Sequence, residues 1–313
     1  MKKDILLIPE IINLNNKSFD KNMGCAVAVG SFDGVHLGHR RLISSLVNEA
    51  KHTGVPSAVF TFDTEDNPKS APILAQTEMK YSILRSLGVD FVFSAPFSEF
   101  RDISAENFVI DVLLGFAGAR ALVCGYDFRF GKDKKVDVQL IRRLVADKAS
   151  VIMTDAYVHD GSPVSSTRIR KLISDGLVDQ AGALLGRYFS FSAPILHGAK
   201  LGRKLGFPTV NQAYPHGLVR PRFGVYAVKV RLGDIICGGV ANVGIKPTVG
   251  SDLVSCETHI FDYTGDCYGE IAEISFLDFI RPEERFNSLE ALKYQVEQDK
   301  LSALKILEKE KCI

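Results

Sequence analysis

The chain carries almost no excess charge of either sign. Lysine and arginine together number 38, and aspartate and glutamate number 37. A protein that binds nucleic acid or an anionic membrane through its general charge needs a clear basic excess, and this chain has none. Small anionic substrates need only a local cluster of positive groups. We therefore expect small-molecule partners, and neither nucleic acid nor a membrane.

Paired cysteine motifs and long apolar runs are also missing. The six cysteines are scattered without a Cys-x-x-Cys pair, which favours free thiols over a zinc site or a disulfide framework. The apolar stretch near the N-terminus, Ile5–Ile8, is too short to span a membrane, and no small-residue cleavage site follows it. We expect a cytoplasmic protein that is neither exported nor anchored.

The sequence of 313 residues contains no internal repeat, low-complexity tract or long linker that would mark a domain boundary. We therefore place the boundary where the hydrophobic periodicity changes. From Cys25 to about Leu177, short apolar runs alternate with helical patterns. The expected strands include Ala58–Phe62, Phe91–Phe93 and Ala121–Cys124, and the expected helices are Lys80–Leu87, Ala105–Phe116 and Val138–Val145. This order predicts an α/β domain with a Rossmann-like, doubly wound parallel sheet, whose ligands bind at the carboxyl ends of its strands.

After about Arg187 the pattern changes to short strands and turns. Alternation over Tyr226–Leu232, followed by Gly233-Asp234 and an apolar run, predicts a hairpin. Further expected elements are strands over Cys256–Phe261 and Ala272–Phe276 and a closing helix capped by Ser288, with Glu290 in its first turn. The second half is therefore expected to be a small antiparallel β-barrel with a C-terminal helix. We predict one domain over residues 1–184 and the other over 185–313.

The string GSFDGVHLGH at residues 30–39 follows the apolar run Cys25–Val29. A tight turn that opens a helix directs free backbone N–H groups toward an anion, and His36 and His39 could hold the phosphates of ATP. Gly34 and Gly38 would leave space for a triphosphate. Histidines at this spacing can also be surface residues or metal ligands, and the glycines can belong to an ordinary turn.

Two further motifs of the first half suit a nucleotide or a flavin. The loop GYDFRFG at residues 125–131 combines the aromatic rings of Tyr126 and Phe128 with the charged side chain of Asp127, which suits a flat heterocycle. Its alternative is a structural turn with aromatic residues in the core. The string SSTRIR at residues 165–170 precedes a helical run, where its hydroxyls could cap the helix or clamp β- and γ-phosphates together with Arg168.

The second half has its own glycine- and lysine-rich string, LHGAKLGRKLGFPTVN, at residues 196–211. Spaced glycines and basic side chains suit a backbone cradle for phosphates. Thr209 and Asn211 are two apart on an extended segment, so both can offer neutral oxygens to one Mg²⁺ ion. The alternative is a β-turn in which both side chains bond to the backbone.

The three motifs of the first half, in this order and spacing, resemble the adenylyltransferase module of the prokaryotic bifunctional riboflavin kinase/FAD synthetase family. The resemblance implies transfer of AMP from ATP to FMN with Mg²⁺. It implies transition-state and phosphate contacts for His36 and His39. The expected ATP-binding residues of this module are Gly30, Phe32, Asp33, Gly34, Gly38, Asp127, Ser166, Thr167 and Arg168, and the expected flavin-binding residues are Tyr126 and Phe128.

The second half resembles the riboflavin kinase domain of the same family along almost its whole length. The strings that carry this resemblance are the 196–211 string, NVGIKPT at 242–248, CETH at 256–259 and FIRPEERF at 279–286. It implies that Glu257 is the catalytic base for the ribityl hydroxyl and that Arg281 belongs to the flavin side. It also implies phosphate contacts for Gly202, Lys204, Gly206 and Pro208 and Mg²⁺ contacts for Thr209 and Asn211.

One segment departs from the family pattern. The family has Phe-x-Pro-His-Pro after its second strand, where this chain has FDTEDNP at residues 62–68, and a family glycine is absent near Val136. We expect a bifunctional enzyme that uses ATP and Mg²⁺ to make FMN from riboflavin and FAD from FMN. The alternatives are a riboflavin kinase with an impaired adenylyltransferase domain, a flavin-binding regulator, and an adenylyltransferase for another phosphorylated cofactor, which the barrel half disfavours.

Overall fold

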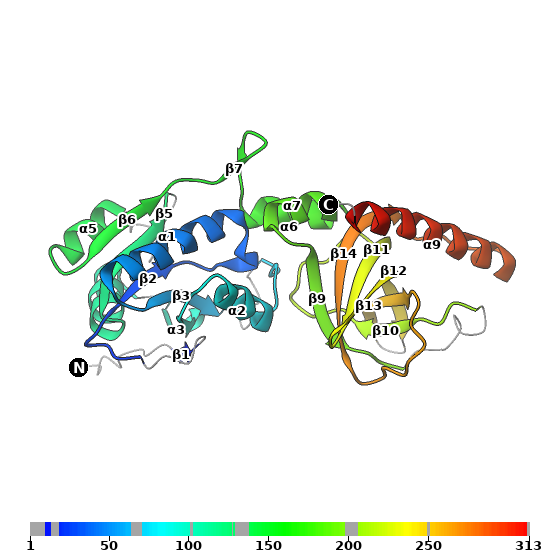
Figure 1. The fold of residues 1–313 in the computed structure, drawn as a ribbon, viewed down its shortest axis with the longest axis horizontal. Helices are drawn as coiled ribbons and strands as arrows, with labels where there is room; N and C mark the ends of the chain where they lie inside the picture. The colour runs from blue at the N-terminus through cyan, green and yellow to red at the C-terminus, as the bar shows by residue number, and fades with distance from the viewer. Residues whose placement is uncertain are drawn as a thin grey trace. The chain divides into compact units, whose positions relative to one another are not determined.

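The computed structural model describes residues 10–13, 19–63, 71–100, 103–126, 128, 138–197, 206–248 and 251–311 (Figure 1). The chain divides into two compact units. The first comprises Met1–Ala71 and Gln76–Ser165, and the second comprises Pro72–Ala75 and Ser166–Ile313. Each unit has its own sheet and is described by itself.

The first unit is built on a six-stranded sheet. Its strands are β1 (Glu10–Asn13), β2 (Cys25–Val29), β3 (Ser57–Asp63), β4 (Phe91–Pro96), β5 (Ala119–Gly125) and β6 (Ser150–Thr154). They lie in the order β1-β4-β3-β2-β5-β6, and all pairs from β4 to β6 are parallel. The predicted parallel sheet is confirmed, with β1 added as an antiparallel edge strand.

Helices cover both faces of this sheet. They are η1 (Asp33–Val35), α1 (Leu37–Thr53), α2 (Thr77–Ser86), α3 (Phe97–Phe100), α4 (Ala105–Asn107), the π-helix η2 (Phe108–Phe116) and α5 (Val138–Val145). On one face, Ile43 and Leu46 of α1 pack with Val59 of β3. On the other face, η2 and α5 pack through Phe108 and Ile141. The predicted doubly wound arrangement is therefore present. A small hairpin, β7 (Val158–His159) with β8 (Ser162–Pro163), completes the unit.

The strand order reverses direction beside β2. The chain runs from β2 outward through β3 to β4 and then returns to place β5 on the other side of β2. Because β2 and β5 are parallel, the segments after Val29 and Gly125 leave the sheet at the same edge. Such a switch point leaves a crevice in which doubly wound domains bind ligands. Residues 30–39, here called the histidine turn, and the loop at residues 125–131 both start there.

The second unit combines two helices with a barrel and a long terminal helix. Its elements are α6 (Ser166–Ser174), α7 (Val178–Leu185), β9 (Phe189–Pro194), β10 (Val210–Ala213), β11 (Gly224–Leu232), β12 (Ile235–Thr248), β13 (Ser251–Ile260), β14 (Ile271–Arg281) and α9 (Leu289–Lys311). The strands are antiparallel in the order β10-β13-β12-β11-β14-β9. The bridge Leu196–Asn211 and two bonds from the Gln212 amide to Ala193 and Ala272 link the ends, so the predicted antiparallel barrel is confirmed.

The terminal helix α9 packs on the outside of the barrel. Ser288 Oγ accepts a hydrogen bond from the Ala291 N–H at 3.1 Å, which confirms the predicted cap. Ala303 and Leu307 of α9 join a buried cluster with strand residues. A Cβ atom on Gly238 would lie 2.4 Å from a Leu307 methyl group, so the absence of a side chain at Gly238 allows the helix to approach the sheet closely.

Within the described parts of the chain, no helix is long and apolar enough to cross a bilayer. Five of the six cysteines lie in those parts, and all five are free thiols, as predicted. Burial raises the pKa of Cys25 and of Cys124 to about 12, so these thiols are protonated packing groups.

Candidate functional site

The backbone of the histidine turn is held in left-handed conformations. Phe32, Gly34 and Val35 have φ angles of 48°, 75° and 41°. For the β-branched Val35 this conformation costs on the order of 1–3 kcal/mol. The cost is offset because Phe32 and Val35 are fully buried in the core under α1. The fold therefore imposes one backbone path on the residues that lead into His36.

His36 caps α1 with its side chain. Its Nδ1 accepts a hydrogen bond from the His39 backbone N–H at 3.2 Å, so the neutral ring carries its proton on Nε2. The rings of His36 and His39 stack with their centroids 3.6 Å apart and their planes 13° apart. A Cβ atom on Gly38 would lie 3.1 Å from His36 Cε1, so the glycine leaves room for this ring. The structure thus brings the two predicted histidines together.

The environment of His39 favours the neutral imidazole. His39 is partly buried. Desolvation of its ring lowers the pKa of His39 well below its usual 6.5, and the neighbouring His36 lowers it further. Its Nδ1 is buried and has no hydrogen-bond partner among the described residues. Buried polar atoms are normally paired, so this nitrogen marks a place where a ligand can supply the partner.

The predicted flavin-binding residues Tyr126 and Phe128 follow β5 at the sheet edge where the histidine turn also begins. Thr61 Oγ1 donates to the Ser31 carbonyl oxygen at 3.0 Å, which ties the turn to β3. Tyr126 follows β5 directly and is 49% exposed, whereas Phe128 is partly buried against the core. Tyr126 can thus offer a ring to a ligand, while Phe128 also has a packing role. Asp127 lies outside the described residues.

The residues of the predicted phosphate clamp lie in a different unit from His36 and His39. Ser166, Thr167 and Arg168 do not precede the helix but form the first turn of α6, and they belong to the second unit. Their pairing with the histidine turn stays a prediction. Gly202 and Lys204 lie outside the described residues, and Gly206 has a positive φ of 87°.

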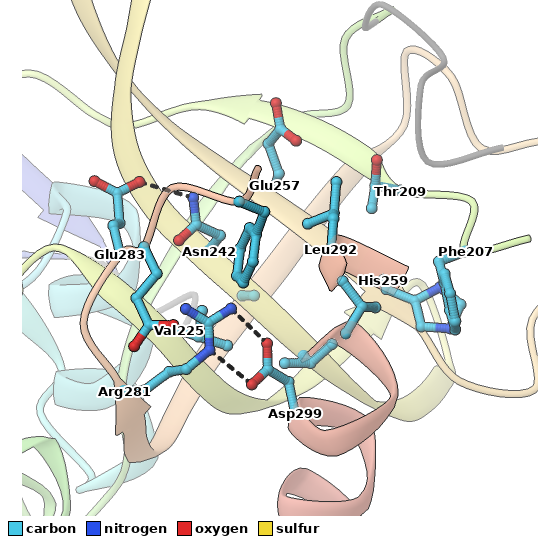
Figure 2. A pocket seen from close by; sticks show the side chains of 15 residues that line it. Phe207, Thr209, Val225, Asn242, Glu257, His259, Arg281, Glu283, Leu292 and Asp299 are labelled. Carbon is cyan, nitrogen blue, oxygen red and sulfur yellow. Dashed lines mark hydrogen bonds and ion pairs between the residues drawn. The ribbon is translucent and has the colours of Figure 1, made fainter. Parts of the chain in front are cut away.

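A cavity of about 290 Å³ lies between the outer face of the barrel and α9 (Figure 2). Strand register places four of its lining residues, together with Asn211, in one row across five neighbouring strands. Asn211 of β10 pairs with Glu257 of β13, Glu257 with Asn242 of β12, Asn242 with Val225 of β11, and Val225 with Arg281 of β14. Side chains of directly paired residues point to the same face of a sheet. The barrel therefore places Glu257 and Arg281 on one surface, three strand spacings, or about 14 Å, apart.

The two ends of the cavity differ in chemistry. Thr209 and Glu257 line one end, and Arg281 lies at the other end against Asp299 of α9. Phe207, Leu292, Val296 and Phe286 supply apolar walls between polar groups. This combination suits a long ligand with a flat apolar part and a polar chain that ends near Glu257.

A second cavity of about 400 Å³ meets the first at Thr209. Its wall includes His197 and Tyr268, whose ring centroids lie 3.9 Å apart. The backbone at Pro208 is fixed because His259 Nδ1 hydrogen-bonds with the Pro208 carbonyl oxygen at 2.8 Å. Two cavities that meet at one residue can hold two substrates that react with each other there.

The donor set at this junction suits magnesium. Thr209 and Asn211 offer neutral oxygens, and Glu257 offers a carboxylate opposite Asn211. The described residues contain no group of three or more His, Cys, Asp or Glu side chains arranged to hold a metal. Mg²⁺ commonly takes one or two protein oxygens and completes its shell with phosphates and water, so these residues fit it.

Three cavity residues were missed from the sequence as functional candidates. The Asn242 amide donates to Glu283 Oε1 at 3.0 Å, and Asp299 accepts two hydrogen bonds from Arg281. Asn242 and Glu283 belong to the strings quoted for the kinase resemblance but were given no role. Asp299 interrupts the apolar stripe Leu292, Val296, Ala303, Leu307 of α9. A charged residue in such a stripe is a signal that could have identified it.

Known families match both halves of the chain. The family described as FAD synthetase matches residues 18–168, and the family described as riboflavin kinase matches residues 185–307.

Curated relatives extend over nearly the whole chain. A bifunctional riboflavin kinase/FMN adenylyltransferase of Escherichia coli (strain K12) is 35% identical over 301 residues, which cover 94% of this chain and 96% of the relative. A protein of the same name from Bacillus subtilis (strain 168) is 32% identical over 291 residues, covering 89% of this chain and 91% of the relative. A crystal structure described as a macrolide-efflux protein from Streptococcus pneumoniae matches with a TM-score of 0.82 and 28% identity, covering 93% of this chain and 96% of that one.

Proposed function

This chain belongs to the bifunctional riboflavin kinase/FMN adenylyltransferase family, and we propose that it catalyses both reactions of that name. In the first reaction, riboflavin and ATP give FMN and ADP in the barrel unit. In the second, FMN and ATP give FAD and pyrophosphate in the parallel-sheet unit. We assign residues 1–184 to the second activity and 185–313 to the first, and we place the enzyme in the cytoplasm, where ATP is available.

The row from Glu257 to Arg281 is the observation that carries the kinase proposal. It joins a carboxylate and a magnesium-type donor set at one end to the Arg281 guanidinium and the nearby Phe286 ring about 14 Å away. Riboflavin has the matching shape, with a flat ring system and a ribityl chain that ends in a hydroxyl group. We place the ring near Arg281 and Phe286, and the reacting hydroxyl beside Glu257.

The second cavity is the proposed ATP site of the kinase. Its aromatic residues, His197 and Tyr268, suit a nucleobase, and Thr209 lies where the terminal phosphate would reach the first cavity. Thr209 and Asn211 would hold Mg²⁺, which neutralises phosphate charge when it is bound. Gly206 and Pro208 lead into this junction, and we propose that they contact the phosphates.

The kinase step follows from these positions. Glu257 accepts the proton of the ribityl 5′-hydroxyl as its oxygen forms a bond to the γ-phosphorus, and the bond from that phosphorus to the oxygen of ADP breaks. Phosphoryl transfer asks the protein mainly for alignment and charge neutralisation. The barrel supplies alignment because Thr209 directly precedes β10, and β10 is paired in register with β13, which carries Glu257.

The adenylylation step is assigned to the histidine turn. A phosphate oxygen of FMN attacks the α-phosphorus of ATP, and the bond to pyrophosphate breaks. His36 and the neutral His39 donate hydrogen bonds to oxygens on which negative charge grows during this transfer. The unpartnered Nδ1 of His39 supports the presence of a ligand atom at this place.

The single-activity alternative is not favoured. The FAD synthetase match spans residues 18–168, so it includes the departing segment at residues 62–68. Residues 64–68 of that segment lie outside the described residues.

Product analysis tests the proposal directly. The purified chain with riboflavin, ATP and Mg²⁺ should form FMN first and FAD later, as followed by chromatography. A parallel reaction starts from FMN, so that adenylylation is measured without the kinase step. Formation of neither product would contradict the proposal, and FMN without FAD in both reactions would restore the single-activity alternative.

A further inference from the structure

The flavin end of the barrel cavity contains a buried ion pair that the proposed reaction does not use. Asp299, on α9, is 3% exposed. Its Oδ1 accepts a hydrogen bond from Arg281 Nε and its Oδ2 accepts one from Arg281 Nη2, both at 2.8 Å (Figure 2). Gln295, one helical turn earlier, donates to Oδ1 at 3.0 Å. The carboxylate is therefore held from two sides.

Stability alone is a weak reason for this pair. Replacing a buried ion pair by apolar residues of similar volume is often neutral or stabilising. The flanking positions of the same helical stripe, Val296 and Ala303, are already apolar and face the barrel. An apolar residue at position 299 would therefore continue the pattern, so the carboxylate calls for a functional explanation.

The main effect of Asp299 is on the geometry of Arg281. The two-pronged contact fixes the plane of the guanidinium group, and Nη1 donates to the Pro282 carbonyl oxygen at 2.9 Å. Among the described residues, three of its five N–H groups are used in this way. The carboxylate also neutralises the positive charge, so this end of the cavity is suited to an uncharged ring more than to a phosphate.

We propose that Asp299, supported by Gln295, is a positioning residue for flavin recognition. It holds Arg281 in one orientation before the ligand arrives, so that the remaining N–H groups meet hydrogen-bond acceptors on the isoalloxazine ring. The arginine side chain then loses its conformational entropy when the protein folds, so ligand binding does not have to supply that free energy. This inference rests on the proposed kinase function of the same cavity.

The first test measures riboflavin affinity. Asp299→Asn should raise the KM for riboflavin and its Kd, measured by quenching of riboflavin fluorescence, by about tenfold or more. The KM for ATP should stay the same, and kcat should change by less than about threefold, because the phosphoryl-transfer end is untouched. Gln295→Ala should have a smaller effect in the same direction. Glu297→Gln, an exposed carboxylate on the same helix, is the matched control and should change neither value.

A double variant separates positioning from folding. Arg281→Met combined with Asp299→Leu buries no unpaired charge, so it should melt at or above the parental temperature. Its riboflavin affinity should nevertheless fall at least as much as that of Asp299→Asn. A folded double variant with parental riboflavin affinity would show that the pair is only structural and would overturn the proposal.

The design keeps this inference distinct from the proposed function. Failure of the parental chain to form FMN contradicts the kinase proposal. Normal FMN formation with an unchanged riboflavin KM and Kd in folded Asp299→Asn contradicts only the positioning role. Adenylylation of supplied FMN by each preparation checks that the rest of the chain is intact.

Discussion

The imidazole of His39 lies stacked on that of His36, its Nδ1 is buried, and its pKa is lowered well below 6.5. A neutral imidazole can donate a hydrogen bond without carrying a charge of its own. Such donors strengthen as negative charge builds on the reacting phosphate, so they favour the transition state over bound ATP. The relationship between these two rings is thus the basis of the adenylylation proposal.

His39→Ala should lower the rate of FAD formation from supplied FMN by roughly a hundredfold or more, the scale of losing one such donor. FMN formation from riboflavin should be unchanged, because the kinase residues lie in the other unit. Both rates come from timed chromatography. A variant that makes FAD at the parental rate would remove the histidine turn from the mechanism.

Burial of neutral His39 also predicts how stability depends on pH. The unfolded chain takes up a proton near pH 6.5 that the folded chain resists, so stability decreases as the pH falls below about 6.5. The melting temperature of His39→Gln should fall less between pH 8 and pH 5.5 than that of the parental chain. Identical losses would contradict a buried neutral His39.

Gly38→Ala tests the fit between Gly38 and the His36 ring. The added methyl group would lie 3.1 Å from His36 Cε1 and should displace the imidazole, lowering FAD formation by about tenfold. Gly182→Ala is the matched control, because that helical glycine has only ordinary contacts around its Cβ position. The control should keep both activities and gain about 0.5–1 kcal/mol of stability. Equal activity in the two variants would show that the His36 position is unimportant.

Glu257→Gln should slow FMN formation by about a hundredfold or more, because the amide cannot accept the ribityl proton. FAD formation from supplied FMN should survive. Steady-state rates for the two half-reactions measured separately provide the check, and a parental kinase rate would exclude Glu257 as the base.

Thr209→Ala should weaken the use of Mg·ATP in the kinase step, since one oxygen at the junction of the two cavities is lost. We expect a higher Mg²⁺ requirement and a KM for ATP raised severalfold, with the riboflavin KM little changed. A steep fall in melting temperature with unchanged activity per folded molecule would instead identify Thr209 as a turn residue.

Local patterns were sufficient to predict the buried strands and the terminal helix. Cys25–Val29 is apolar throughout because both faces of β2 are covered, and Ser288 has the local chemistry of a helix cap. Strand β1 was missed because the pairing that makes it a strand comes from β4, far along the chain. The cap formed by His36 was also missed, since histidine is not a usual capping residue.

The cavity row could not be predicted from local sequence. Glu257, Asn242 and Arg281 share one surface only because two hairpins and the long-range pairing of β11 with β14 fix the register of the strands between them. The Arg281–Asp299 pair depends on where α9 crosses the barrel. Motifs therefore indicated which residues matter, whereas long-range register determined how they meet.

The central claim is that one chain uses ATP in two different ways, and labelled ATP tests it most directly. With riboflavin and Mg²⁺, ATP labelled at the γ-phosphate should label FMN, and ATP labelled at the α-phosphate should leave FMN unlabelled but label FAD. In His39→Ala the γ label should still reach FMN, while the α label should be almost absent from FAD. Failure of the γ label to enter FMN, or of the α label to enter FAD, in the parental chain would contradict the account.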